Sequence, residues 1–130
     1  MALLTKYVLT EMQAEMVANN INSYLYIAPQ DATGIFCTMF PYSTVTEYTF
    51  NEIMDSVNIQ VSIFNKDDAS ALLDLGSDIF DLFSEYEAYD GTSRIFCSKI
   101  VNQRGPEYLA KEEYWQYVME LTFNTIKDKI

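Results

Sequence analysis

The sequence contains no histidine, and that absence removes several kinds of chemistry at once. Without imidazole there can be no Ser-His-Asp triad and no Cys-His pair, and the commonest ligand of transition metals is missing. The four glycines (Gly34, Gly76, Gly91 and Gly105) are too far apart for a phosphate-binding loop or a dinucleotide-binding turn. No acidic stretch has the spacing of a calcium-binding hand. We therefore predict no catalytic residue, no cofactor and no metal site, and we do not expect an enzyme.

Basic residues are scarce and unevenly placed. The formal net charge is −11, and no Lys or Arg occurs between Tyr7 and Asn65. The acidic residues of that segment are Glu11, Glu15, Asp31, Glu47, Glu52 and Asp55. An acidic surface repels phosphate backbones, so the chain is not expected to grip nucleic acid. The same charge would let DNA pass without sticking.

Long apolar runs are also missing, since none approaches the roughly 20 residues of a membrane span. The start, Met-Ala-Leu-Leu-Thr-Lys, lacks a basic region followed by a sustained apolar core, so we expect no signal peptide and synthesis in the cytoplasm. Cys37 and Cys97 each lie within an apolar run, which predicts two buried thiols in a reducing compartment. The sequence leaves a disulfide between them open.

The most regular pattern in the chain is the stretch from Ser56 to Phe64. Apolar and polar residues alternate there, as expected for a strand with one buried face and one solvent-facing or partner-facing face. The buried face would carry Val57, Ile59, Val61 and Ile63, and the other face Ser56, Asn58, Gln60 and Ser62. Since 130 residues correspond to one domain, 1–130, the rest of the chain is expected to pack around this strand.

Two amphipathic helices are predicted from apolar residues at helical spacing. The first spans residues 3–20 and the second about 67–86, with Asp67 or Asp68 as its N-terminal cap. The apolar stripe of the second helix contains Ala69, Leu72, Leu73, Gly76, Ile79, Phe80 and Phe83. Gly76 lowers helix propensity by about 1 kcal/mol relative to Ala, so its place in the stripe predicts a close approach to the sheet.

Further strands are predicted at 23–28, 35–40, 93–103 and 114–126, with turns at Asp90-Gly91 and Arg104-Gly105-Pro106. Residues 41–55 form a long connection, rich in Thr, Tyr and acids, that could be a loop or a β-hairpin arm. The expected fold is therefore α+β. It has an antiparallel sheet of four to five strands, an N-terminal helix and a central helix packed on it, and the arm at about 41–55.

Two stretches resemble the tail terminator (tail completion) proteins of long-tailed bacteriophages, a group that includes phage minor capsid proteins. The first is Val57-Asn58-Ile59-Gln60-Val61-Ser62-Ile63-Phe64-Asn65-Lys66, which is similar to the family's alternating strand followed by a helix. The second is Gly105-Pro106-Glu107-Tyr108-Leu109-Ala110-Lys111-Glu112-Glu113-Tyr114-Trp115-Gln116-Tyr117, which is similar to the family's Pro-containing turn and final aromatic strand. The resemblance covers nearly the whole chain by the order of its elements.

The resemblance implies a structural protein of a siphophage virion, located in the tail and without a catalytic site. Copies of the chain, six in the expected case, would form a homo-oligomeric ring that ends the tail tube and joins it to the head connector during virus assembly. Genome DNA would pass through the lumen without specific binding, and no membrane would be involved. In the family, the arm between the second and third strands makes contacts around the ring, and here the arm corresponds to Tyr42–Asp55.

Tyrosine is enriched where protein surfaces meet, and the chain has ten. The alternative is that these rings line the chain's own core. We predict subunit or partner contacts at Tyr42, Glu47, Tyr48, Phe50, Glu52, Tyr108, Glu112 and Glu113.

Two other classes of function stay open. The chain could be a small acidic intracellular adaptor or chaperone that binds a basic protein partner. It could also be a small enzyme that uses carboxylates, with Glu112 and Glu113 as the adjacent pair. Neighbouring residues point apart on a strand and do not face each other on a helix, so such a pair does not converge by sequence position alone.

Overall fold

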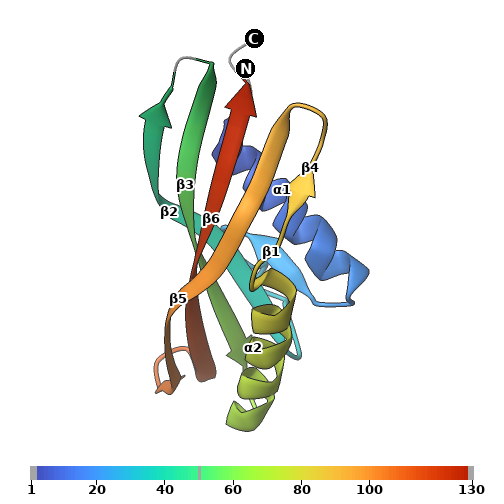
Figure 1. Ribbon diagram of the computed structural model, residues 1–130. Helices are drawn as coiled ribbons and strands as arrows, with labels where there is room; N and C mark the ends of the chain where they lie inside the picture. Colours follow the sequence, from blue (N-terminus) through green and yellow to red (C-terminus); the bar gives the residue numbers. More distant parts are fainter. Residues whose placement is uncertain (1–2, 50, 129–130) are drawn as a thin grey trace.

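The computed structural model describes residues 3–49 and 51–128 and shows an α+β fold (Figure 1). Within these residues the chain forms two helices and one six-stranded sheet. In chain order the elements are α1 (Leu4–Ala18), β1 (Ser23–Leu25), β2 (Phe36–Tyr48), β3 (Glu52–Asn65), α2 (Ala69–Phe83), β4 (Ala88–Tyr89), β5 (Ser93–Leu109) and β6 (Tyr114–Asp128). The N-terminal and central helices were both predicted.

The sheet is mixed and has more strands than the four to five antiparallel strands predicted. Its strand order is β1-β2-β3-β6-β5-β4, with β1 parallel to β2 and all other pairs antiparallel. The predicted strand 23–28 ends at Leu25, because Tyr26 adopts a φ of 69°, outside the extended region. The chain then returns to lay Cys37–Met39 beside Ser23–Leu25 in the same direction. At the other edge, β4 adds only two residues, too few to leave an alternating pattern.

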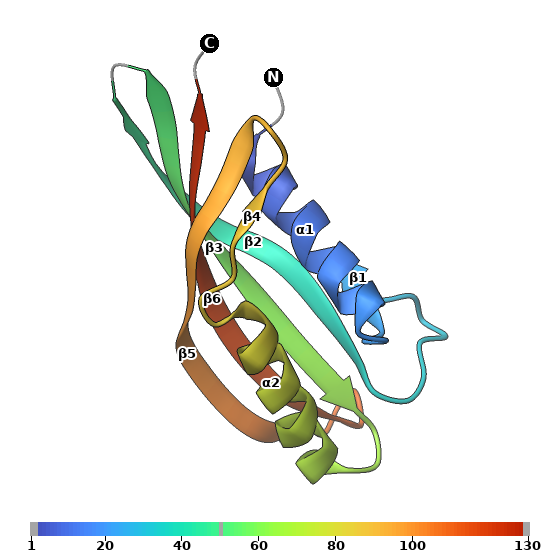
Figure 2. The same ribbon diagram turned by 45° about the vertical axis from the view of Figure 1, so that its right-hand side comes forward.

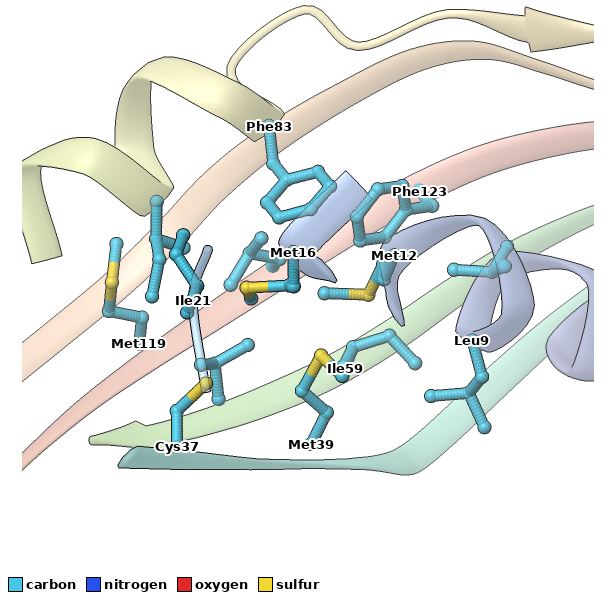
Figure 3. Packing of buried hydrophobic residues seen from close by; sticks show 14 of the residues in the cluster. Leu9, Met12, Met16, Ile21, Cys37, Met39, Ile59, Phe83, Met119 and Phe123 are labelled. Atoms are coloured by element: carbon cyan, nitrogen blue, oxygen red, sulfur yellow. The ribbon is translucent and has the colours of Figure 1, made fainter. Parts of the chain in front are cut away.

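The predicted alternation of β3 is confirmed. Val57, Ile59, Val61 and Ile63 are all fully buried, at the centre of the hydrophobic core. Neighbouring strands add Met39, Met119, Leu121 and Phe123 on the same face. Figure 3 shows these sulfur and aromatic side chains meeting Met12 and Met16 of α1 and Phe83 of α2. One face of the sheet and both helices therefore share one core.

Both helices cover that face (Figure 2). Among the residues that the structure describes, no helix lies on the opposite face of the sheet, here called the outer face. α2 begins after Asp68, whose carboxylate accepts a hydrogen bond of 2.9 Å from the Ser70 amide, as predicted for a cap. Its buried residues are Leu72, Gly76, Ile79 and Phe83. The predicted stripe was too wide, since Leu73 and Phe80 are exposed along the edge of the helix.

Residues 41–49 and 51–55 belong to a β-hairpin, the more ordered of the two predicted forms. β2 continues through Pro41 to Tyr48 and pairs with β3 along its whole length. The register shifts at a bulge between Pro41 and Ser43, where β2 is the edge strand of the sheet because β1 pairs only with Cys37–Met39. Proline is tolerated at bulges and on edge strands. Because β3 pairs with β6 as far as Glu52, this arm is part of the sheet and not a separate protrusion.

The predicted turn at Arg104-Gly105-Pro106 is wrong. β5 runs on to Leu109, and the register shifts between Arg104 and Glu107, so the glycine and proline form a bulge. Gly105 has a φ of 108°, and a Cβ there would lie 2.8 Å from the Gln116 carbonyl oxygen. Glycine is required for this conformation and this approach. The chain reverses instead at residues 110–113, between β5 and β6.

Candidate functional site

The predicted contact residues divide into two groups at opposite ends of the sheet (Figure 1). One group, Glu47, Tyr48 and Glu52, lies near the tip of the arm, at the upper end in the figure, whereas Tyr42 belongs to neither end and lies at the bulge, beside the middle of β3. The other, Tyr108, Glu112 and Glu113, lies around the β5–β6 turn at the lower end. Phe50 lies outside the described residues. The structure therefore brings together each group but does not join the two groups within one chain.

The arm exposes apolar side chains on a well-paired strand. Tyr48 is 72% exposed and Val45 is 59% exposed, while Glu47 is exposed and Glu52 is half-buried. The hairpin closes where the Thr49 amide donates a hydrogen bond of 2.9 Å to the Glu52 carbonyl oxygen. In the arm, β2 pairs with β3 and β3 pairs with β6, so the exposed side chains project from hydrogen-bonded strands.

Tyr42 lies in the bulge and faces the outer side of the sheet. Burial, and to a smaller extent the negative charge of Glu120, raises the pKa of Tyr42 above its ordinary value of 10.0. The neighbouring Ser43 accepts a hydrogen bond of 2.8 Å from Asn58, which connects the bulge to β3. The phenol of Tyr42 is therefore a neutral group at physiological pH, available as a hydrogen-bond donor beside an acidic neighbour.

At the lower end, Tyr108 packs its ring against Trp115, with 5.2 Å between ring centroids and planes at 60°. Glu113 adopts a φ of 61°, and its amide donates a hydrogen bond of 2.7 Å to the Leu109 carbonyl oxygen, which closes the turn. Both Glu112 and Glu113 are exposed. Their exposure and separate orientations give no enclosed pair of carboxylates of the kind that acid–base catalysis uses.

A groove of about 350 Å³ opens beside this turn, on the outer face. Its floor is formed by aromatic rings: Phe36 stacks on Phe64 at 5.4 Å between centroids and meets Tyr114 edge-on at 5.9 Å. Its walls come from the segment 26–32 and from Leu109 and Glu112 at the turn. We call this feature the aromatic groove.

Residues that shape the two surfaces were missed by the sequence analysis. Ile27 is 81% exposed and Tyr26 is 62% exposed at the groove, although both were assigned to a strand. Val45 was not singled out within the arm. Pro29, shortly after Ile27, was the one local signal that the strand ends early.

Between the two ends, the outer face carries a network of uncharged polar side chains. Thr122 donates a hydrogen bond of 2.6 Å to Asn58, and Ser56 donates one of 2.9 Å to Asn124. The network continues toward β5, where Arg104 forms an ion pair of 3.2 Å with Glu120. This face is therefore satisfied by its own hydrogen bonds and close to neutral.

The helix side is much more acidic. The segment from Asp67 to Glu87 contains seven acidic residues and no Lys or Arg. Glu11 on α1 accepts a hydrogen bond of 3.3 Å from the Tyr86 hydroxyl. Burial, followed by the charges of nearby carboxylates, raises the pKa values of Tyr7 and Tyr86 to about 12. The molecule thus has one acidic side and one nearly neutral side.

Among the described residues, no cluster of three or more potential His, Cys, Asp or Glu metal ligands is present. Neither described helix is long and apolar enough to cross a membrane. Cys37 is buried and Cys97 is half-buried, and both are free thiols. Compared with known proteins, the chain matches no family model and no curated sequence.

Proposed function

We propose that this chain is a structural subunit that assembles with copies of itself into a ring, as a phage tail terminator. In this role it stops growth of the tail tube and presents a surface to the head connector. The ring would have six copies and belong to the virion tail. Its partners would be other copies of the chain, the tube protein and the connector protein, with genome DNA passing through the lumen.

The observation that carries this proposal is the placement of the two exposed apolar surfaces. The arm and the aromatic groove lie at opposite ends of one continuous sheet, with a satisfied polar face between them. A surface at each end favours head-to-tail association, which is heterologous and closes into a ring when the rotation per copy allows it. The concentration of acids on one side suits a lumen for DNA, because like charges lower adhesion.

The experiment is to examine the purified chain by native mass spectrometry and negative-stain electron microscopy, alone and with tail tubes. Closed rings of a single copy number, alone or on tube ends, are the expected result. A chain that stays monomeric at high concentration and does not bind tube ends would overturn the proposal. Testing with tubes is essential, since a ring can require the tube as a template.

A second candidate function is an adaptor for a basic protein, and the acidic segment 67–87 favours it. The two proposals differ in their salt dependence. Binding through this acidic segment would weaken steeply with ionic strength, whereas a ring built on apolar contacts would persist at high salt.

A further inference from the structure

We propose that the aromatic groove binds a segment of another protein in which apolar side chains are flanked by lysine or arginine. The inference does not depend on the ring assembly proposed above. Copies of the chain can also meet at this end of the sheet through Tyr108, which is exposed and does not line the groove.

The groove offers apolar surface and space for one or two side chains. Its floor consists of the rings of Phe36, Phe64 and Tyr114. Tyr26 and Ile27 are exposed on its wall, beside a hollow of about 350 Å³. Ligand pockets range from about 300 to 1,000 Å³, so this hollow is at the small end and fits part of a peptide better than a complete cofactor. An apolar side chain from a partner would remove the wall and floor from water.

The surroundings of the groove are acidic. Three stretches meet at this end of the sheet, namely residues 29–36, 64–68 and 107–114. They carry six exposed carboxylates and two exposed lysines: Asp31, Asp67, Asp68, Glu107, Glu112 and Glu113, with Lys66 and Lys111. Glu112 lines the groove itself. This excess of negative charge attracts a cationic partner and repels phosphate groups and acidic segments.

The chain's own Lys66 already places an ammonium group over a ring of the floor. Its Nζ lies 5.9 Å from the centre of the Tyr114 ring, which is within the range of a cation–π contact. A partner's lysine or arginine would meet the same ring and the carboxylate of Glu112, which also lines the groove. The aliphatic stem of such a side chain packs on apolar surface while its charge stays near the acids. Lys66 itself repels this cation, so it limits the affinity of the groove.

The test uses the full chain and three terminally blocked octapeptides in isothermal titration calorimetry. The first peptide, Gly-Lys-Arg-Leu-Phe-Arg-Lys-Gly, has an apolar centre and basic flanks. The second has Glu and Asp in place of the basic residues, and the third has Ser-Ser in place of Leu-Phe. We expect the first peptide to bind at least about tenfold more tightly than either of the others, because it alone matches both the apolar hollow and its acidic surroundings.

Variants at exposed positions locate the binding, and circular dichroism checks that each is folded. Glu112→Gln removes a carboxylate from the groove and Ile27→Ser removes apolar wall surface, so each should weaken binding of the first peptide about threefold. Lys66→Gln removes the competing cation and should strengthen it about twofold. Asp81→Asn is the matched control for charge, since Asp81 is exposed on α2, which covers the other face of the sheet. It should bind the peptide like the wild type.

The inference is wrong if the first peptide binds no more tightly than the other two, or if Lys66→Gln weakens its binding. It is also wrong if Asp81→Asn weakens binding as much as Glu112→Gln does, since the attraction would then be diffuse. Excess peptide should leave any oligomer of the chain intact in sedimentation velocity. An oligomer that dissociates would place a second copy in the groove and contradict the inference. Rings without peptide binding would leave the proposed function standing alone, and peptide binding without rings would leave the inference standing alone.

Discussion

Gly76 of α2 lies directly against the ring of Tyr117 of β6: a Cβ added at position 76 would lie 3.2 Å from Cε2 and 3.4 Å from Cδ2 of that ring. The Tyr117 hydroxyl donates a hydrogen bond of 2.7 Å to Gln103, which holds the ring in place. The close approach to the sheet predicted for Gly76 is therefore present, and the residue that it approaches is Tyr117.

Gly76→Ala should destabilise the protein in the presence of Tyr117 and stabilise it in its absence. In the wild type, crowding against the ring costs about 1–3 kcal/mol and outweighs the gain of about 1 kcal/mol in helix propensity. In a Tyr117→Ala background the crowding is removed, so the same change should raise the free energy of unfolding by about 1 kcal/mol. Urea unfolding of the four variants of this cycle measures both values, and an equal effect in the two backgrounds would contradict the prediction.

Ser98 connects the end of α2 to β5, and its loss should be costly. Its buried hydroxyl donates to the Phe83 carbonyl oxygen and accepts a hydrogen bond of 2.6 Å from the Tyr86 amide. Ser98→Ala leaves both backbone groups without this partner, which should lower the free energy of unfolding by about 2–3 kcal/mol. Ser84→Ala, at the exposed C-terminal cap of α2, is the control and should change it by less than about 0.5 kcal/mol. If Ser98→Ala and Ser84→Ala lowered the free energy of unfolding equally, the hydrogen bonds of Ser98 would not stabilise the junction between α2 and β5.

The sequence predicted the elements with strong periodicity and failed where a bulge interrupts it. The alternation of β3 was correct because four β-branched residues face one core. In β5, by contrast, bulges shift the register between Ile95 and Cys97 and between Ile100 and Asn102. Each bulge changes which residues point inward, so simple alternation does not describe either face along the whole strand.

The candidate surfaces could be predicted only in part. Tyr42, Tyr48 and Tyr108 were chosen because tyrosine is enriched where protein surfaces meet, and all three are exposed. Ile27 lies in an apolar tetrapeptide that looks like a strand, and only the positive φ of Tyr26 turns it outward. Backbone conformation of that kind is set by tertiary contacts, which a pattern of residue types does not contain.

The face assignment of β3 predicts opposite outcomes for neighbouring positions. Val61→Asp places an unpaired charge in the core, which costs several kcal/mol and should unfold the domain. Gln60→Lys places a charge on the outer face, directly opposite Glu120, where an opposite-charge pair contributes about 0.2–1 kcal/mol. Circular dichroism and thermal unfolding distinguish the two, and a folded Val61→Asp variant would mean that the core has been placed on the wrong face.

Alkaline pH should destabilise the protein through groups that are buried in their neutral form. Burial raises the pKa of the Cys37 thiol from 9.0 to about 12, and those of Tyr7 and Tyr86 rise from 10.0 to about 12. Between the two values the unfolded chain has lost the proton and the folded chain keeps it, so unfolding releases protons. The free energy of unfolding should therefore be unaffected by these groups below about pH 9 and should fall as the pH rises from 9 to 12.

The thiol and the phenols can be separated by the pH at which each begins to act. Between about pH 9 and 10, Cys37 alone of the three should contribute to the fall, so Cys37→Ala should flatten the curve there. Tyr86→Phe should flatten it only above about pH 10. Urea unfolding at half-unit steps of pH measures the slopes, with a thiol reagent as a second measurement. At neutral pH the half-buried Cys97 should react in the folded protein and Cys37 only after unfolding. A Cys37 that reacts as fast as Cys97 would contradict the burial that raises its pKa.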